Sequence, residues 1–174
     1  KLVPGATRLV WAETPSNPHW HIYDLAALAE IAHAAGARLV VDNTVATPIL
    51  TQPISFGADL VVHSATKYLN GHSDVLAGAA LTAKADDFWE KVVFNRDYTG
   101  GLLGQFQAAL LMRGMRTLHL RVERACRSAE ALAAALQDHP RIKAVFYPGL
   151  KNHPGHGLAA RQMRGGFGGM MSIR

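Results

Sequence analysis

The chain has 174 residues, of which 49% are hydrophobic and 18% are charged. This length is enough for one domain, or for one domain and part of another, and the composition argues against disorder. The formal net charge is +5, but lysines and arginines are spread along the whole chain and no nucleic-acid-binding motif accompanies them, so we expect no nucleic-acid partner.

Cysteine content and hydropathy indicate the cellular compartment in which we expect the protein. Cys126 is the only cysteine, which excludes an internal disulfide and any multi-cysteine metal site. No apolar run approaches the roughly 20 residues that a membrane-spanning helix needs, and residues 1–8 lack the apolar core of a signal peptide. We therefore expect a cytoplasmic protein with no membrane partner. Because the chain begins without Met and stops within an apolar run, we also expect it to be a piece of a longer polypeptide.

The first half of the chain alternates between strand and helix patterns. Residues 7–13 form an apolar run that ends at two prolines, which is typical of a buried strand followed by a loop. Asp24 is a suitable N-cap for a helix whose apolar spacing continues to Gly36. The β-branched runs at 38–42 and 58–63 indicate two more strands. This order predicts βαβ units, and hence an α/β fold with a mostly parallel sheet and flanking helices.

The second half has a different pattern. We expect a strand at 78–83, helices at 86–95 and 105–114, and a longer helix that starts near Leu118 and ends before Pro140. Two further strands, at 145–147 and 169–173, are separated by a polar, glycine-rich stretch. The change predicts a domain boundary near residue 114, with a large domain at 1–114 and the beginning of a smaller α+β domain at 115–174.

Reactive side chains follow two of the predicted strands. Asp42 comes directly after one strand, and Ser64, Thr66 and Lys67 come directly after the next. In a parallel α/β sheet, ligands bind beyond the carboxyl ends of the strands, so adjacent strands would bring these groups to one edge. Taken singly, each is an ordinary turn or surface residue. Together they match the needs of pyridoxal phosphate (PLP): a lysine for the cofactor aldehyde, a carboxylate near the pyridine nitrogen, and hydroxyl groups for the phosphate.

Several segments resemble one family of PLP enzymes. Glu13–Pro18, Val41–Thr44 and above all His63–Val75 are similar to the signature segments of the cystathionine, or Cys/Met metabolism, family, and Leu111–Leu118 and Gly155–Gly168 are similar to its later segments. The family includes cystathionine γ-synthases, γ-lyases and β-lyases, methionine γ-lyases and acylhomoserine sulfhydrylases, and the lysine segment is most similar to the first two. The resemblance implies an aspartate-aminotransferase-like fold (fold type I), of which residues 1–114 would be the C-terminal portion of the large PLP-binding domain.

The resemblance also implies a role for each site residue. Lys67 would bond covalently to PLP and then shuttle protons, with Asp42 on the pyridinium nitrogen. Ser64 and Thr66 would bind the phosphate, and Asn17 would lie close to the ring oxygen of the cofactor. The implied reaction is a β- or γ-elimination, or a γ-replacement, on a small sulfur-containing or acyl-activated amino acid. The implied assembly is a homo-oligomer, a dimer of dimers.

The resemblance places some of the family's functional groups outside this chain. A ring-stacking tyrosine and part of the phosphate site would lie upstream, and the arginine that binds the substrate carboxylate would lie downstream. We therefore predict that the 174-residue chain alone binds PLP weakly and is inactive.

Two other functions remain open from the residues alone. Another PLP enzyme of the same fold type, such as an aminotransferase, would share Lys67 and Asp42 but not the segment that follows the lysine. A non-catalytic α/β binding domain would need neither residue.

Other candidate sites are weaker. The pairs His19–His21 and His153–His156 lack the third ligand and the carboxylate partner that a metal site needs, so we expect loop histidines and no metal. Residues 165–169 are glycine-rich but precede a strand pattern and not a helix, which favours a loop that allows close backbone approach over a phosphate-binding loop. Cys126 lies on the apolar stripe of the long helix, so we expect it to pack in the core.

Overall fold

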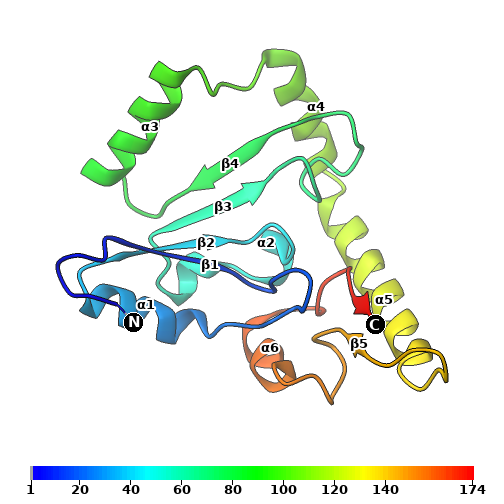
Figure 1. Ribbon diagram of the computed structural model, residues 1–174. Helices are drawn as coiled ribbons and strands as arrows, with labels where there is room; N and C mark the ends of the chain where they lie inside the picture. The colour runs from blue at the N-terminus through cyan, green and yellow to red at the C-terminus, as the bar shows by residue number, and fades with distance from the viewer. Residues whose placement is uncertain (1) are drawn as a thin grey trace.

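A four-stranded sheet forms the centre of the larger part of the molecule (Figure 1). The computed structural model describes residues 2–174. The strands β1 (Leu9–Glu13), β2 (Arg38–Asp42), β3 (Leu60–Ser64) and β4 (Gly78–Leu81) lie in that order. β1, β2 and β3 are parallel, and β4 runs antiparallel to β3. The prediction of a mostly parallel sheet is confirmed.

Helix α1 (Leu25–Ala34) covers one face of this sheet. The Asp24 carboxylate caps its first turn by accepting the Ala27 N–H at 3.0 Å. The helix ends before Gly36, whose φ of +72° suits glycine and lets the chain turn back into β2. Both ends therefore agree with the sequence signals. The buried face of the helix packs on inward side chains of β1, β2 and β3, including Leu39 and Val61.

The connection from β2 to β3 contains two short elements that the sequence pattern did not predict. These are α2 (Thr47–Leu50) and a 3₁₀ helix, η1 (Pro53–Phe56), each four residues long and each with a proline in its first turn. Elements of one turn are too short to show a hydrophobic period. Leu50 is nevertheless fully buried, so this connection contributes to the core.

The second half contains the helices α3 (Asp87–Thr99), α4 (Gln105–Met115), α5 (Leu118–Leu136) and α6 (His156–Gln162), and the short antiparallel strands β5 (Val145–Phe146) and β6 (Ser172–Ile173). α3 extends beyond the predicted 86–95. Helix α6 forms within the glycine-rich stretch 149–166, where the sequence analysis predicted no helix. The Gln162 side chain of α6 is buried and accepts the Leu25 N–H at 3.0 Å, so a contact 137 residues away in sequence accompanies this helix.

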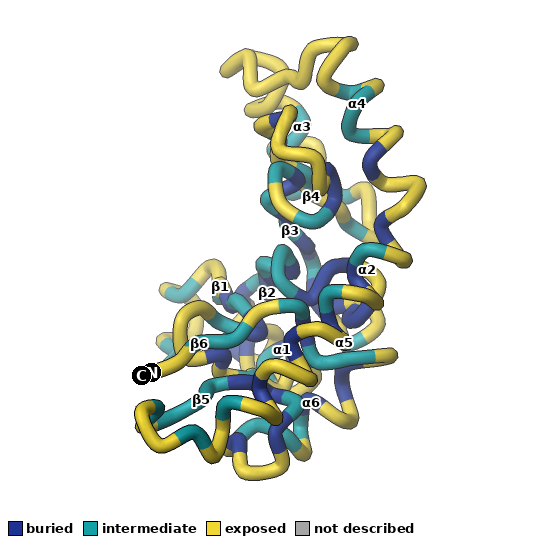
Figure 2. Tube along the Cα trace, turned by 90° about the vertical axis from the view of Figure 1, so that its right-hand side faces the viewer, coloured by how far each residue is buried: buried dark blue, intermediate teal, exposed yellow. Residues whose placement is uncertain are grey.

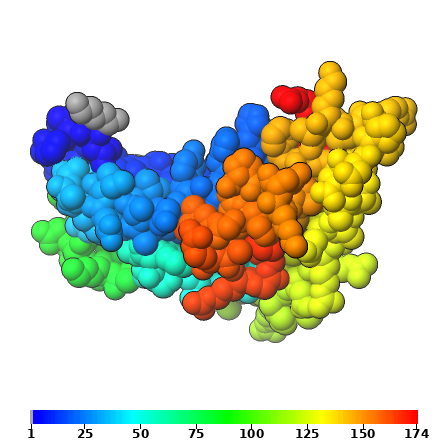
Figure 3. Space-filling view, turned by 90° about the horizontal axis from the view of Figure 1, so that it is seen from below, coloured from blue at the N-terminus to red at the C-terminus, as the bar shows by residue number. Residues whose placement is uncertain are grey.

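Helix α5 joins the two halves of the chain. Its buried stripe, Leu118, Val122, Cys126, Ala129 and Ala133, packs at one end against the lysine segment and at the other against residues near β5. Figure 3 shows α6 and its flanking residues (orange) between α1 (blue) and α5 (yellow). The short link between α4 and α5 contains residues 116–117. The domain boundary near residue 114 stays a prediction.

Most residues around α3 and α4 are exposed, as the upper part of Figure 2 shows. Within residues 87–99, α3 has no buried side chain. The exposed large hydrophobic side chains of this region are Leu76, Leu81, Phe94, Tyr98, Leu102, Phe106 and Met112. None of the helices in residues 2–174 combines the length and the apolar character needed to cross a bilayer.

Candidate active site

The two strands that precede the candidate residues are direct neighbours in the sheet. β2 and β3 are parallel, and Asp42 pairs with Val62 in their register. Asp42 is the last residue of β2, Ser64 is the last of β3, and Lys67 follows three residues later. The carboxyl ends of the two strands therefore meet at one edge, as predicted. In an open α/β sheet this edge is where ligands bind.

Backbone hydrogen bonds fix the carboxylate at this edge. The Thr44 N–H donates to Oδ1 of Asp42 at 2.9 Å. The Thr44 hydroxyl in turn accepts the N–H of Ser64 at 2.7 Å, and the Asn43 N–H donates to the Val62 carbonyl at 3.0 Å. The turn after β2 is thus bonded directly to the start of the lysine segment. Asp42 remains half-buried, so its carboxylate is held in place but is not enclosed.

The lysine lies in a tightly turned loop. The Lys67 N–H donates to the Ser64 carbonyl at 3.1 Å, and the Lys67 carbonyl accepts the Gly71 N–H at 2.8 Å. The Thr66 hydroxyl accepts the Ala77 N–H at 3.0 Å and is 3.3 Å from the Ala77 carbonyl oxygen, to which it donates. These bonds fix the loop between β3 and β4, while the Lys67 side chain itself is exposed.

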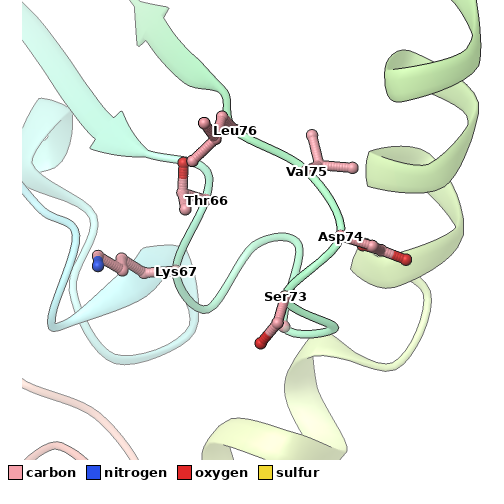
Figure 4. Close-up of a pocket in the computed structure, with 7 residues that line it drawn as sticks. Thr66, Lys67, Ser73, Asp74, Val75 and Leu76 are labelled. Atoms are coloured by element: carbon pink, nitrogen blue, oxygen red, sulfur yellow. The ribbon is translucent and has the colours of Figure 1, made fainter.

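A cavity of about 560 Å³ opens beside this loop (Figure 4). Its lining residues are Thr66, Lys67, Gly71, Ser73, Asp74, Val75 and Leu76. In Figure 4 the Lys67 amine extends away from Ser73 and Asp74. The structure therefore brings Thr66 and Lys67 to one cavity, whereas Asp42, Ser64 and Asn17 are not among its lining residues.

Asn17 lies in the loop that follows β1. β1 pairs with β2 so that Glu13 is opposite Asp42, and the loop therefore leaves the sheet at the same edge. Its two ends are joined by a bridge between Ser16 and His21. Asn17 is exposed on this loop. Its proposed role beside the cofactor ring stays a prediction.

Three buried polar side chains near this edge were not singled out from the sequence. They are Asn43, His63 and Asn70, and each has one buried nitrogen or oxygen atom without a hydrogen-bond partner among residues 2–174. Burial lowers the pKa of His63, and the charge of Asp42 partly opposes this effect. Buried polar atoms without partners mark positions where bound water or a ligand would complete the hydrogen bonds. The signal for His63 was available, because it occupies an inward position in the alternating pattern of β3.

The two histidine pairs noted in the sequence, His19–His21 and His153–His156, lie close to each other. The rings of His19 and His21 are 5.7 Å apart. His153 is buried, and its pKa is lowered by burial and by the nearby His21 and His156. Among residues 2–174, no group of three or more His, Cys, Asp or Glu side chains is arranged to hold a metal ion.

The glycine-rich segment 165–169 and Cys126 pack closely together. Cys126 is 3% exposed on α5, and burial raises the pKa of its thiol. A Cβ atom on Gly166 would lie 3.0 Å from the Cys126 sulfur, and one on Gly169 would overlap the Tyr68 hydroxyl. The prediction that these glycines allow close backbone approach is confirmed.

The chain is similar to known proteins that are more than twice as long. A model of the family described as Cys/Met metabolism PLP-dependent enzymes matches residues 1–174. Cystathionine gamma-synthase of Mycobacterium tuberculosis is 51% identical over 168 residues, which are 97% of this chain and 43% of that protein. Cystathionine beta-lyase of Coxiella burnetii is 45% identical over 173 residues, 99% of this chain and 44% of that protein.

A solved structure has the same fold. Cystathionine gamma synthase from Xanthomonas oryzae pv. oryzae, in complex with cystathionine, superimposes with a TM-score of 0.90 at 48% identity, over 95% of this chain and 42% of that one. The chain thus spans less than half the length of these relatives. With a family model matched along its whole length and the lysine segment at the carboxyl edge of the sheet, the chain belongs to the Cys/Met metabolism family of PLP-dependent enzymes.

Proposed function

We propose that the whole protein is a transsulfuration enzyme that catalyses β- or γ-elimination, or γ-replacement, on cystathionine, an O-acylhomoserine or a related sulfur amino acid. One observation carries the proposal. In a member of a PLP-dependent family, Lys67 and Asp42 follow directly from adjacent parallel strands at the same sheet edge.

The residues at this edge fit the cofactor. PLP needs an accessible amine, a fixed carboxylate for its pyridine nitrogen and hydrogen-bond donors for its phosphate. Lys67 is exposed, and a backbone N–H holds the Asp42 carboxylate. Ser64 and Thr66 shortly precede the lysine in sequence. The Thr66 hydroxyl must give up its 3.3 Å bond to the Ala77 carbonyl in order to donate to a phosphate.

Each side chain then has one task. The bound cofactor withdraws electrons from the α-carbon of the substrate through its pyridine ring. Lys67 would hold the cofactor through its amine and, once free, would take up the α-proton of the substrate on that amine. Asp42 keeps the pyridine nitrogen protonated through its negative charge. Ser64 and Thr66 would bind the phosphate, and Asn17 would contact the ring oxygen of the cofactor.

The substrate proposal rests on the names of the relatives. The similar proteins include a γ-synthase and a β-lyase, and the Xanthomonas enzyme is described with cystathionine bound. These names favour a small amino acid whose β- or γ-substituent leaves as a thiol or a carboxylate. Membership of the family favours this function over an aminotransferase or a non-catalytic binding domain.

The proposed assembly is a cytoplasmic homo-oligomer, a dimer of dimers. The exposed large hydrophobic side chains around α3 and α4 support this proposal, because protein–protein interfaces are enriched in aromatic residues and methionine. Light scattering of the full-length protein measures the assembly directly. A monomer would contradict the proposal.

Borohydride reduction of the full-length protein with PLP, followed by peptide mass mapping, tests the central claim. We expect modification at Lys67 and its loss in Lys67→Ala, while Lys84→Ala is labelled like the wild type. Scatter over Lys84, Lys91, Lys143 and Lys151 would contradict the assignment. With labelling confined to Lys67, assays with cystathionine, acylhomoserines and methionine identify the reaction.

A further inference from the structure

The loop that carries Lys67 is held by an arginine from a distant part of the chain. Arg121, in the first turn of α5, donates from Nη1 to the carbonyl of Tyr68 at 2.8 Å, a contact that spans 53 residues. Its Nη2 donates to the Gly114 carbonyl at 2.8 Å, and its Nε donates to the Thr117 hydroxyl at 3.1 Å. One guanidinium therefore joins the lysine loop to the end of α4 and the start of α5.

The backbone around this guanidinium leaves no room for side chains. Gly71 has a φ of +70°, and a Cβ atom there would overlap the guanidinium of Arg121. Gly114 is buried, and a Cβ atom there would overlap the carbonyl oxygen of Asn70. Glycine at both positions thus lets the loop and the α4–α5 corner approach closely enough for the arginine to reach the Tyr68 carbonyl.

The contact acts on the backbone directly after the lysine. Tyr68 is the next residue, and the Lys67 carbonyl already accepts the Gly71 N–H. Because the Lys67 side chain is exposed, residues of this chain fix its amine mainly through the backbone that carries it. The Arg121 bond constrains that backbone from the side of α5.

We propose that Arg121 is a positioning residue for Lys67: through the Tyr68 carbonyl, its guanidinium holds the lysine loop in the arrangement that presents the amine to the cofactor. The inference rests on the proposed role of Lys67. Hydrogen bonds from a charged group are about twice as strong as neutral ones, and the planar fork of arginine reaches two separate carbonyls at once. A lysine at this position keeps the charge but not the fork. Lysine therefore restores only part of the effect.

The test uses the full-length protein with Arg121→Gln, Arg121→Lys and, as a matched control, Arg124→Gln, which changes an exposed arginine of the same helix. Hydrogen exchange is measured first, without cofactor. We expect amides of residues 65–73 to exchange about tenfold faster in Arg121→Gln, because the loop loses its charge-assisted bond at the Tyr68 carbonyl. Residues 38–42 should keep the wild-type rate. Arg121→Lys should be intermediate, and Arg124→Gln should match the wild type.

Cofactor-loaded protein provides the second measurement. We expect PLP to dissociate about tenfold faster from Arg121→Gln, because the same bond to the Tyr68 carbonyl is lost. The visible absorbance of the lysine-bound cofactor should change its pH midpoint in Arg121→Gln and recover in part in Arg121→Lys. Altered packing alone would leave that midpoint unchanged.

Wild-type exchange in residues 65–73 of both Arg121 variants would overturn the inference, as would equal acceleration in residues 38–42. If Arg121→Gln does not fold, Arg121→Lys decides by the same criteria. Failure of the wild-type protein to hold PLP on Lys67 would instead refute the proposed function, and the cofactor-free exchange data would still decide whether Arg121 holds the loop.

Discussion

Acid should lower the free energy of unfolding in part by protonating His153, and a substitution of His153 can measure that part. His153 is 9% exposed, and its Nδ1 accepts the N–H of Gly155 at 3.0 Å. Protonation would place a hydrogen on Nδ1, which could then no longer accept this bond. Burial lowers the pKa of His153, and His21 and His156 lower it further, while a bond to the backbone of His19 partly opposes the shift.

The sign and size of the effect follow from proton linkage. An unfolded histidine has a pKa of about 6.5 and takes up a proton before the folded one does. The stability that neutral His153 contributes is fully present above about pH 6.5. It is lost as the pH falls from 6.5 toward the lowered pKa of folded His153. The free energy of unfolding can fall by at most about 1.4 kcal/mol for each pH unit below pH 6.5, so the largest possible loss between pH 7 and pH 5 is about 2 kcal/mol.

Urea unfolding of the cofactor-free, full-length protein at pH 7 and pH 5 measures this loss. In His153→Asn the side-chain oxygen can still accept the Gly155 N–H but does not titrate, so the acid-dependent loss should shrink by up to about 2 kcal/mol. His119→Asn, at an exposed position of α5, should leave it unchanged. Buried His63 also has a lowered pKa and adds a loss of its own. The reasoning is refuted if His153→Asn loses as much stability on acidification as the wild type.

Two further changes test the packing around α5 and the lysine loop. Gly114→Ala should destabilise the protein by about 1–3 kcal/mol because its Cβ meets the Asn70 carbonyl. In contrast, Gly157 is at an exposed position of α6 where an added Cβ has only an ordinary contact, so Gly157→Ala should stabilise the protein slightly. A destabilised Gly157→Ala protein would contradict this comparison. Leu118→Ala should lower the free energy of unfolding by about 2–5 kcal/mol, because the Leu118 side chain is buried in the core and only 6% exposed. Leu120 is 57% exposed, so Leu120→Ala should change the free energy of unfolding by less than about 0.5 kcal/mol. Denaturant midpoints check both pairs, and equal costs for the two leucines would show that the buried stripe of α5 is misassigned.

Local signals in the sequence were sufficient to predict a helix or strand where one short segment contained the whole pattern. Asp24 and Gly36 mark the ends of α1 because a cap and a left-handed turn depend on residues a few positions apart. The β-branched runs before Asp42 and Ser64 predicted β2 and β3 for a similar reason. The meeting of the two strand ends followed from the general geometry of parallel sheets. Elements of one turn, such as α2, carry no such pattern and were missed.

The sequence by itself therefore determined the α/β class, the principal helices and strands and the candidate lysine and carboxylate. Only the tertiary structure decided how distant segments support them. The Arg121 bond to the Tyr68 carbonyl spans 53 residues, and the Gln162 bond to the Leu25 N–H spans 137. Such contacts depend on where the chain folds back in three dimensions, and hydrophobic periods and turn residues describe only the near neighbours of each residue.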